Sequence, residues 1–297
     1  MKKKNSLKQH TNWGLIPFCA PALILVFIFF YYPTFSGVNI AFYNWNGIGR
    51  LSNAEFVGLG NFIRLVDDTV FWNSVRFSLL FMAVNVVVIN AIAILLASLL
   101  ANKLITGSFL RILFFAPNII PLVATALMWL FLFSTAYHSF AQSINIEALN
   151  IDWFGGRVQA RATLFIVTWW VMSGYLMIIY LAGLKSIDTG LLEAAAIDGC
   201  SGIRLFFKIK LPLIMPSVVI CMFLVTNNSI RAFDLPFLLT NGGPFNSTAT
   251  IPLDIFQTAF TFRQFGYASA KSLVLLALVM IVTFLTIYSL KRRELEG

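Results

Sequence analysis

Charged residues are scarce in this sequence. Only 11% of its 297 residues are Asp, Glu, Lys or Arg, and 59% are hydrophobic, whereas a soluble domain typically carries about 25% charged residues. This composition excludes a disordered chain, a coiled coil and an ordinary cytosolic enzyme. It predicts an all-α polytopic membrane protein, in which lipid surrounds most of the surface.

Residues that form disulfides, metal sites and nucleotide sites are also few. The three cysteines lie far apart without a CxxC pair, which indicates neither a disulfide framework nor a zinc site: they are Cys19, Cys200 and Cys221. The only histidines, His10 and His138, lie outside the apolar stretches. Ser173 therefore has no histidine at membrane depth to activate it, and we do not expect an intramembrane serine protease. No GxxxxGK[ST] phosphate loop is present. We therefore expect no cofactor or metal on this chain and no ATP hydrolysis by it.

Six uncharged stretches are long enough to span a bilayer, which requires about 20 mostly apolar residues. They are Trp13–Tyr32, Phe77–Ala101, Ile112–Tyr137, Ala162–Leu184, Leu211–Ile230 and Ser272–Leu290. A seventh, Leu235–Leu253, contains three prolines and Gly242-Gly243. Such a backbone cannot satisfy its own hydrogen bonds in lipid, so this segment is interpreted as an external loop or a re-entrant segment packed on protein.

Lys and Arg are unevenly distributed between the segments that join these stretches. The positive-inside rule then places both termini in the cytoplasm and also accounts for the net charge of +9, so nucleic acid is not an expected partner. The predicted parts are a basic tail (1–12), a first transmembrane helix (13–32), an extracytoplasmic loop (33–76), a core of five spans (77–290) that includes a cytoplasmic loop (185–211), and a short tail (291–297).

The cytoplasmic loop has the signals of two short helices. Strong helix formers fill Leu191–Ile197, and Thr189 or Gly190 is the expected N-cap. Gly199 suits the left-handed conformation after a helix end, and Ser201 can cap a second helix. Such a projection can dock into the groove of a partner, or it can be a solvated amphipathic connector.

The same loop resembles the "EAA" loop of permeases of bacterial ABC importers. The matching residues are Glu193-Ala194-Ala195, Gly199 and Leu211-Pro212. Further segments resemble the branch that serves maltose, multiple-sugar and glycerol-3-phosphate importers: residues 44–47 (NWNG), 56–59 (FVGL), 61–62 (NF), 71–74 (FWNS), 239–244 (LTNGGP) and 266–270 (GYASA). The resemblance implies the transmembrane-domain fold of type I ABC importers.

The resemblance also implies partners and a coupling role for the loop. The partners are a second homologous permease, two copies of a cytoplasmic ATPase that bind ATP-Mg, and an extracytoplasmic solute-binding protein, all at a bacterial cytoplasmic membrane. In this family the first helix of the loop docks in a cleft of the ATPase. The implied coupling residues are Glu193, Ala194, Ala195, Asp198, Gly199, Leu211 and Pro212.

Polar residues inside the spans are the candidates for substrate binding, because such residues are costly in lipid. A neutral sugar needs amide or hydroxyl groups beside aromatic rings. The candidates are Tyr175, Ser229, Asn228, Asn227, Trp170, Asn85 and Asn118. By the resemblance, Tyr175 matches a sugar-contacting tyrosine, whereas Ser229 and Ala232 stand where disaccharide-binding relatives carry Asn. The alternative for each Asn is a hydrogen bond between helices.

The predicted function is import of a sugar, expected to be a di- or oligosaccharide, by alternating access. A permease for glycerol-3-phosphate or another polar solute is one alternative. An ion-coupled secondary transporter is another, but it usually needs ionisable groups near the midplane, and the six stretches contain none. Arg231 and Asp234, just beyond the fifth stretch, are expected to form an ion pair, to contact the binding protein or to close an external gate.

Overall fold

The computed structural model describes residues 15–102, 106–144, 151–294 of the chain. Within these ranges, five helices are long and apolar enough to cross a membrane, or six if one bent pair counts as a single span. The predicted all-α membrane fold with about six spans is confirmed. The predicted basic tail (1–12) and the final residues 295–297 of the predicted last tail lie outside the described residues.

The elements follow one another in an almost entirely helical order. The first part comprises α1 (Leu15–Val26), η1 (Phe27–Tyr31), α2 (Tyr32–Ile40), β1 (Tyr43–Asn44), η2 (Leu51–Asn53), β2 (Glu55–Phe56), α3 (Gly60–Val66), α4 (Thr69–Ala101), α5 (Gly107–Ile119), α6 (Leu122–Phe131), η3 (Leu132–Ala136) and α7 (Tyr137–Ile144). The second part comprises α8 (Arg157–Lys185), α9 (Thr189–Ile197), α10 (Gly202–Leu205), η5 (Phe206–Lys210), α11 (Leu211–Leu213), α12 (Met215–Ile230), α13 (Asp234–Thr240), α14 (Ile251–Phe256), η6 (Gln257–Thr261) and α15 (Phe265–Glu294).

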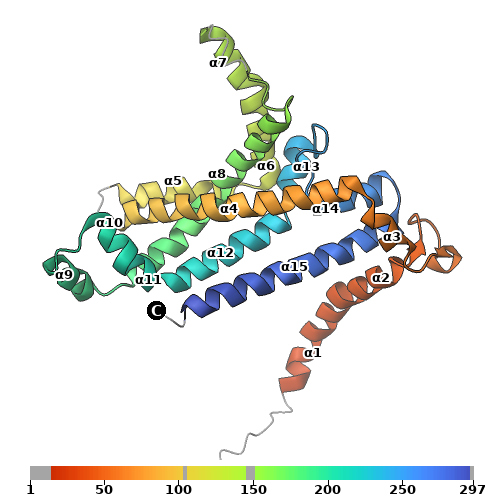
Figure 1. Cartoon of the computed structure of the whole chain (residues 1–297), viewed down its shortest axis with the longest axis horizontal. Coiled ribbons are helices and arrows are strands. Elements are labelled where there is room, and N and C mark those ends of the chain that lie inside the picture. Colours follow the sequence, from red (N-terminus) through yellow and green to blue (C-terminus); the bar gives the residue numbers. More distant parts are fainter. Residues whose placement is uncertain (1–14, 103–105, 145–150, 295–297) are drawn as a thin grey trace, which may run out of the picture.

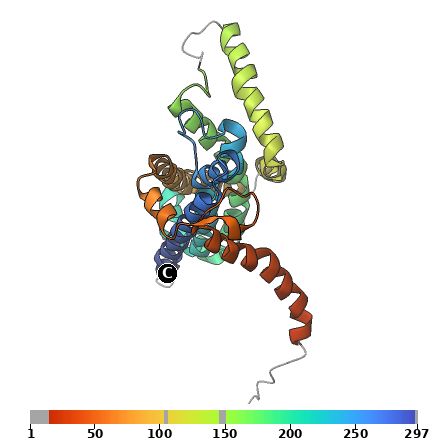
Figure 2. The same cartoon turned by 90° about the vertical axis from the view of Figure 1, so that its right-hand side faces the viewer.

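The core is a bundle in which α4 packs against α8 and α12, while α5 packs against α8 and α15 against α12 (Figure 1). The short helix α9 lies at one end of this bundle and α3 at the other. The helices α1 and α6–α7 leave the bundle in different directions (Figure 2). The exposed side chains of α1 and η1 include Leu23 at 63% and Phe29 at 75%, as expected of surfaces that face lipid or another subunit.

The third predicted stretch, Ile112–Tyr137, does not form one helix. Helix α5 ends at Ile119, and α6 begins at Leu122. Between them Pro121 lacks a backbone N–H, and the residue before it, Ile120, has extended backbone angles (φ −68°, ψ 130°), as the proline ring requires. The apolar helix Leu122–Ser143 therefore leaves the bundle at the end of α5 (Figure 1).

The fifth predicted stretch is broken as well. The helical segments Gly202–Leu213 and Met215–Ile230 meet at an angle of 77°, next to Pro212 and Pro216. The proline-rich segment that follows forms α13 and α14, which pack on α6, α8 and α4. Its apolar side chains Leu239, Ile251 and Leu253 are buried. The segment is thus packed on protein, where its backbone finds partners outside lipid.

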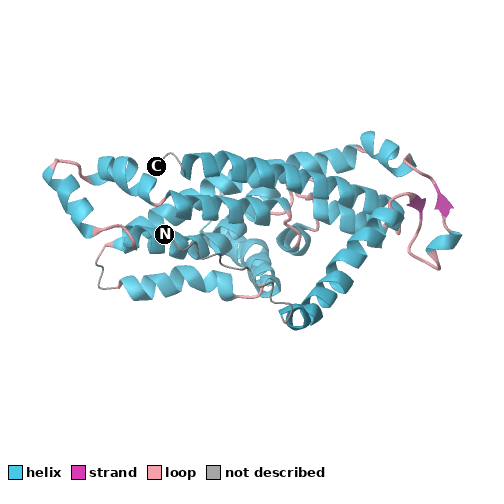
Figure 3. Cartoon of the chain, turned by 90° about the horizontal axis from the view of Figure 1, so that it is seen from below, coloured by secondary structure: helices cyan, strands magenta, loops and turns pink. Residues whose placement is uncertain are grey.

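Two distant motifs meet at the start of α15. The amide of Gly266 donates to the carbonyl of Trp45 at 3.0 Å, and the ring of Phe265 covers Gly47 so closely that no Cβ would fit there. The side chain of Asn61 donates to the carbonyls of Ala41 and Tyr43. The small antiparallel sheet of β1 and β2 lies at the same end of the bundle (Figure 3). These contacts hold the first loop against the last span.

A buried cluster of charges occupies this end of the bundle. The ammonium group of Lys271, which is 3% exposed, lies 2.7 Å from a carboxylate oxygen of Asp254 and 3.0 Å from one of Asp68. It also donates to Oγ1 of Thr258 at 3.1 Å. The predicted stretch Ser272–Leu290 itself contains no charged residue, but α15 begins at Phe265 and is longer than that stretch, so the helix also carries Lys271.

The two carboxylates of the cluster differ in their surroundings. Burial raises the pKa of Asp254, although Lys271 opposes the shift. Burial also acts to raise the pKa of Asp68, but hydrogen bonds from the Phe71 amide, Tyr267 and Lys271 outweigh it and lower that pKa. Asp68 therefore contributes stability at neutral pH that is lost as the pH falls through its folded-state pKa. The cluster joins the start of α4 to α14 and α15.

We predict that Lys271→Met destabilises the fold by about 3–5 kcal/mol, because it leaves the buried carboxylate of Asp254 and the half-buried carboxylate of Asp68 without their cation. Thermal unfolding of the detergent-solubilised protein measures the effect. The exposed Lys208 provides the control, since Lys208→Met makes the same change in solvent. Adding Asp254→Asn to Lys271→Met should recover part of the loss. Equal midpoints for the two single variants would contradict a structural role for the cluster.

Candidate functional site

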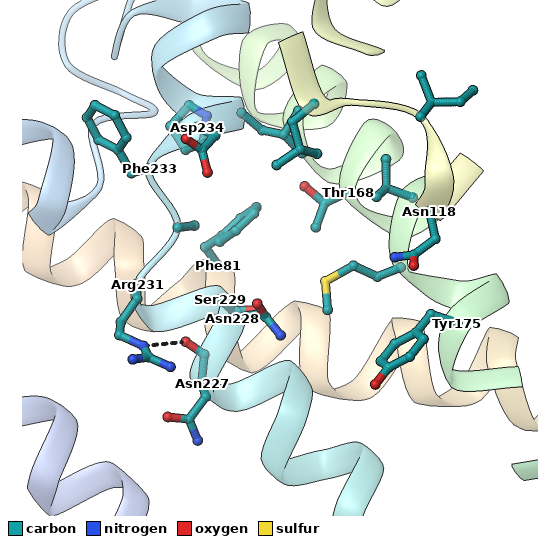
Figure 4. A pocket seen from close by; sticks show the side chains of 17 residues that line it. Phe81, Asn118, Thr168, Tyr175, Asn227, Asn228, Ser229, Arg231, Phe233 and Asp234 are labelled. Atoms are coloured by element: carbon teal, nitrogen blue, oxygen red, sulfur yellow. Dashed lines mark hydrogen bonds between the residues drawn. The ribbon is translucent and has the colours of Figure 1, made fainter. Parts of the chain in front are cut away.

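A cavity of about 630 Å³ lies where α8, α12 and α13 meet the junction of α5 and α6 (Figure 4). Five of the seven predicted substrate residues line it: Asn118, Tyr175, Asn227, Asn228 and Ser229. They come from three different helices, and the two asparagines of α12 lie across the cavity from Tyr175 and Asn118. The cavity therefore combines amide, hydroxyl and aromatic groups.

The wall formed by α8 follows from helical spacing. Thr168, Met172 and Tyr175 recur at intervals of four and three residues and share one face of the helix, and all three line the cavity. Tyr175 is 36% exposed. Thr168 and Met172 were not among the sequence candidates, although their spacing from Tyr175 could have identified them.

The end of α12 presents its asparagines in a defined way. The side-chain N–H groups of Asn227 and Asn228 donate to the carbonyls of Phe223 and Leu224, four residues earlier, at 3.2 Å and 3.0 Å. These bonds fix the side chains along the helix while each amide oxygen remains available as an acceptor. The asparagines can therefore accept hydrogen bonds from solute hydroxyl groups in the cavity.

Two opposite charges also line the cavity. Arg231 and Asp234 both contribute to its wall. They do not form the ion pair that was one of the three roles predicted for them, because the ion pairs found among the described residues both involve Lys271. Nε of Arg231 instead donates to the carbonyl of Asn227 at 3.3 Å (Figure 4). The two charges remain available to a solute or to a partner.

Asn85 lies outside the cavity and links three helices. It is fully buried; its amide nitrogen donates to Oγ of Ser229 at 3.2 Å, and its amide oxygen accepts from Nε1 of Trp169 at 2.9 Å. Asn85 thus makes the contact between helices that was the alternative to substrate binding. Ser229 lines the cavity, but it is only 2% exposed and its hydroxyl oxygen accepts a hydrogen bond from Asn85.

Trp170 also lies away from this cavity. Its ring packs edge-on against Trp129, with the ring centroids 5.5 Å apart. It lines a separate, mostly apolar cavity together with Phe114 and Pro117. The structure therefore brings five of the sequence candidates together and leaves Trp170 and Asn85 out of the group.

The loop with the predicted coupling residues folds as a short helix followed by a bend. The N-cap of α9 is Asp188, whose carboxylate accepts from the amide of Gly190 at 2.8 Å; the expected caps, Thr189 or Gly190, are therefore wrong by one or two residues. Gly199 has φ +73°, and the amide of Cys200 donates to the carbonyl of Ala195. The left-handed residue predicted at the end of this helix is confirmed.

The side chains of this loop divide between its two faces. Ala195 is buried against the rest of the chain, whereas Glu193, Ala194 and Asp198 are exposed. The second helix starts at the predicted position, but Ser201 makes no capping hydrogen bond, and Leu211 and Pro212 form the single turn α11 before the bend. Large apolar side chains also remain exposed here, including Ile197 at 87% and Ile203 at 79%.

The loop is joined directly to two of the helices that line the cavity. Helix α8 ends at Lys185, four residues before α9 begins, and α12 follows α10 and α11. Helix α9 is thus connected along the chain to α8 on one side and to α12 on the other. Among the described helices, α8 and α12 are the pair that both lines the cavity and flanks this loop.

The position of Asn118 depends on close packing of α5 against α8. At Gly174 a Cβ would collide with the carbonyl of Phe114, so only glycine permits this approach. We predict that Gly174→Ala lowers stability by about 1–3 kcal/mol through overpacking, measured by thermal unfolding in detergent. Gly37→Ala, in α2, is the control because a Cβ there meets nothing within 4 Å. Equal stability of the two variants would contradict the close approach.

Comparison with known proteins adds to this geometry. The family model described as "Binding-protein-dependent transport system inner membrane component" matches residues 92–294. The chain is 34% identical to the "Probable starch degradation products transport system permease protein AmyD" of Thermoanaerobacterium thermosulfurigenes, over 100% of both chains. It is 32% identical to the "Multiple sugar-binding transport system permease protein MsmF" of Streptococcus mutans, over 95% of this chain and 96% of the relative.

A solved structure shares the fold. A chain from a bacterial ABC transporter involved in the import of the acidic polysaccharide alginate superposes with a TM-score of 0.83 at 18% identity, covering 94% of this chain and 96% of the other. The family model spans well over half of the chain, and the resemblance expected from the "EAA" loop is confirmed. The chain belongs to the family of binding-protein-dependent transport system inner membrane components, the permeases of ABC importers.

Proposed function

We propose that this permease forms part of the pathway of an ATP-driven importer for a di- or oligosaccharide. The observation that carries the proposal is the continuity between α9 and the two helices that line the cavity, α8 and α12. Relatives support the solute class, since they include permeases of starch degradation product, multiple-sugar and lactose transport systems.

The chemistry of the cavity suits a neutral sugar. Acceptors on Asn227 and Asn228 line the same cavity as the hydroxyl group of Tyr175 and the amide of Asn118, while Met172 and other apolar side chains can pack on the C–H faces of a sugar ring. Arg231 and Asp234 balance each other in charge. This balance favours a neutral sugar over glycerol-3-phosphate, although a relative at 30% identity is a glycerol-3-phosphate permease.

The exposed surface of α9 is the proposed contact with the ATPase. Glu193 orients the helix in a cleft of the ATPase, Ala194 permits a close approach and Ile197 supplies apolar area. Two ATPase subunits hold ATP-Mg, and a second permease completes the pathway. A bound solute-binding protein is supported by a solved relative of similar fold, which is in complex with an alginate pentasaccharide-bound periplasmic protein. Both termini then lie in the cytoplasm.

Transport proceeds by alternating access. Docking of the loaded binding protein and closure of the ATPase dimer displace α9, and α8 and α12 move with it. The cavity then opens toward the outside and receives the solute, and ATP hydrolysis resets it toward the cytoplasm. An ion-coupled transporter is not favoured, because the buried charge of α15 is already paired with two carboxylates at the end of the bundle.

We predict that Asn228→Ala and Tyr175→Ala each reduce solute uptake about fivefold or more, because each removes a hydrogen bond worth roughly 1 kcal/mol. Uptake of a panel of radiolabelled sugars into proteoliposomes with the assembled complex measures the effect. Trp170→Phe is the control, since Trp170 lies outside the cavity. Unchanged uptake in both alanine variants would remove these residues from the solute site.

We predict that Glu193→Lys abolishes stimulation of the ATPase by the loaded binding protein, because it reverses a charge on the surface that contacts the ATPase. Measuring ATPase activity and uptake in the same vesicles separates coupling from solute binding. Glu55→Lys, on the exposed strand β2 at the opposite end of the bundle, is the matched charge reversal. Normal coupling in Glu193→Lys would count against the role of α9.

A further inference from the structure

A second cavity, of about 310 Å³, collects three arginines at the end of the bundle remote from α9. Arg76 comes from α4, and Arg157 and Arg161 come from the first turns of α8. The remaining wall contains no Asp or Glu and includes Phe77, Phe245 and Ser247. A concave site with three guanidinium groups suits an anion with several oxygen atoms.

Neighbouring groups hold two of the guanidinium groups in place. Nε of Arg161 donates to the carbonyl of Ser247 at 2.9 Å, and its guanidinium carbon lies 5.4 Å from the centre of the Phe77 ring. The guanidinium carbon of Arg157 lies 5.1 Å from the centre of the Phe245 ring. Aromatic contact of this kind occupies the flat face of a guanidinium and leaves N–H groups at its edge for oxygen ligands.

The cavity also lacks an internal counter-charge. Among the described residues, no carboxylate lies within 4 Å of any of the three arginines, because the ion pairs there are those of Lys271. Asp67 lines an adjoining cavity that also contains Arg76, but it forms no ion pair with it. The hydroxyl oxygen of Ser247 is buried in this wall without a hydrogen-bond partner. A bound oxyanion would offset the repulsion between the arginines and accept from this hydroxyl.

The position of this cavity relative to the membrane follows from the exposed face of α4. One face of this helix is exposed along its length and apolar below Arg76, with Leu80 at 45%, Val87 at 68%, Leu95 at 60% and Leu99 at 55%. Arg76 lies on the same face, and the distance from it to Leu99 is about 35 Å at 1.5 Å per residue. The hydrocarbon core of a bilayer is about 30 Å thick, so Arg76 lies at the level of the phospholipid headgroups.

The neighbouring aromatic residue agrees with this depth. Trp72 lies one turn beyond Arg76 and is 40% exposed, and its indole N–H donates to the carbonyls of Leu65 and Val66. Tryptophans of this kind are enriched at the interface between membrane and water. The arginines therefore surround a polar cavity at that interface, with the apolar surface of Leu80 directly below.

We propose that this cavity binds a phosphoryl oxyanion, supplied by the headgroup of an anionic phospholipid. The phosphate accepts hydrogen bonds from Arg76, Arg157 and Arg161, and the lipid chains follow the exposed face of α4 beyond Leu80. Free inorganic phosphate presents the same oxygen atoms and is the other possible source. The site is independent of the proposed sugar pathway, because none of its lining residues lines the larger cavity.

Native mass spectrometry of the full-length permease, purified with the subunits that accompany it, tests this site. The probes are phosphatidylglycerol, zwitterionic phosphatidylcholine and inorganic phosphate. The variant is Arg76→Gln with Arg157→Gln, both exposed and therefore tolerant of substitution. Arg50→Gln with Arg263→Gln is the control, because these exposed arginines lie outside the cavity and remove the same charge.

Wild type and control should bind phosphatidylglycerol in preference to phosphatidylcholine, and the cavity variant should bind it at least about tenfold more weakly, because hydrogen bonds to charged groups are lost. Binding of inorganic phosphate that depends on the same arginines, with no gain from the lipid, would support the oxyanion site and identify free phosphate as its source. Normal binding of phosphatidylglycerol by the cavity variant would overturn the proposal. The loss of an accompanying subunit from that variant, with lipid binding intact, would overturn it in favour of a protein interface.

Discussion

The arrangement of the helices around the larger cavity depends on the amide of Asn85. This side chain bonds to Ser229 of α12 and to Trp169 of α8 from its position in α4, and it is fully buried. An amide left without partners in hydrocarbon costs several kcal/mol, so the three helices are held at the one separation that satisfies it. Ser229 is thereby fixed, and with it the direction in which Asn227 and Asn228 point.

The clusters of charged side chains lie apart from the larger cavity, whose lining carries no net charge. Lys271 is paired with two aspartates beside the sheet of β1 and β2, and the arginine cavity lies at the same end of α4. In contrast, the larger cavity has hydroxyl and amide groups with one positive and one negative side chain. The paired charges around Lys271 at one end and a loop joined to α8 and α12 at the other are consistent with opening and closing driven from the α9 end.

Much of the fold follows from hydropathy and local turn chemistry. Uncharged stretches identified the helices, and Gly199 identified the end of α9, because a left-handed residue at that place favours glycine. The failures have physical causes. Pro121 ends α5 inside an apolar run, and Lys271 remains in a helix because aspartates distant in sequence neutralise it. Asp188 replaces Thr189 as the N-cap, a difference of one position within the same turn.

The candidate site could be predicted only in part. Asn85 and Asn228 are the same residue type in similarly apolar surroundings, and sequence alone does not tell which one faces the cavity. The partner of Asn85 lies 144 residues away, so the answer depends on how α4 and α12 are rotated against each other. Tyr175 and Asn228 were found because polar side chains inside a span are costly in lipid unless they serve a ligand or another helix.

The central claim is that displacement of α9 changes access to the cavity between α8 and α12. Its most direct test is the labelling of a single cysteine at Asn228→Cys by a membrane-impermeant thiol reagent, with Cys19, Cys200 and Cys221 replaced by serine in the assembled complex. We expect ATP to change the labelling rate when α9 is intact, and Gly199→Val to remove that change, because valine does not fit the φ of +73° at the bend. A labelling rate that ignores ATP, or that responds equally with Gly199→Val, would contradict the account.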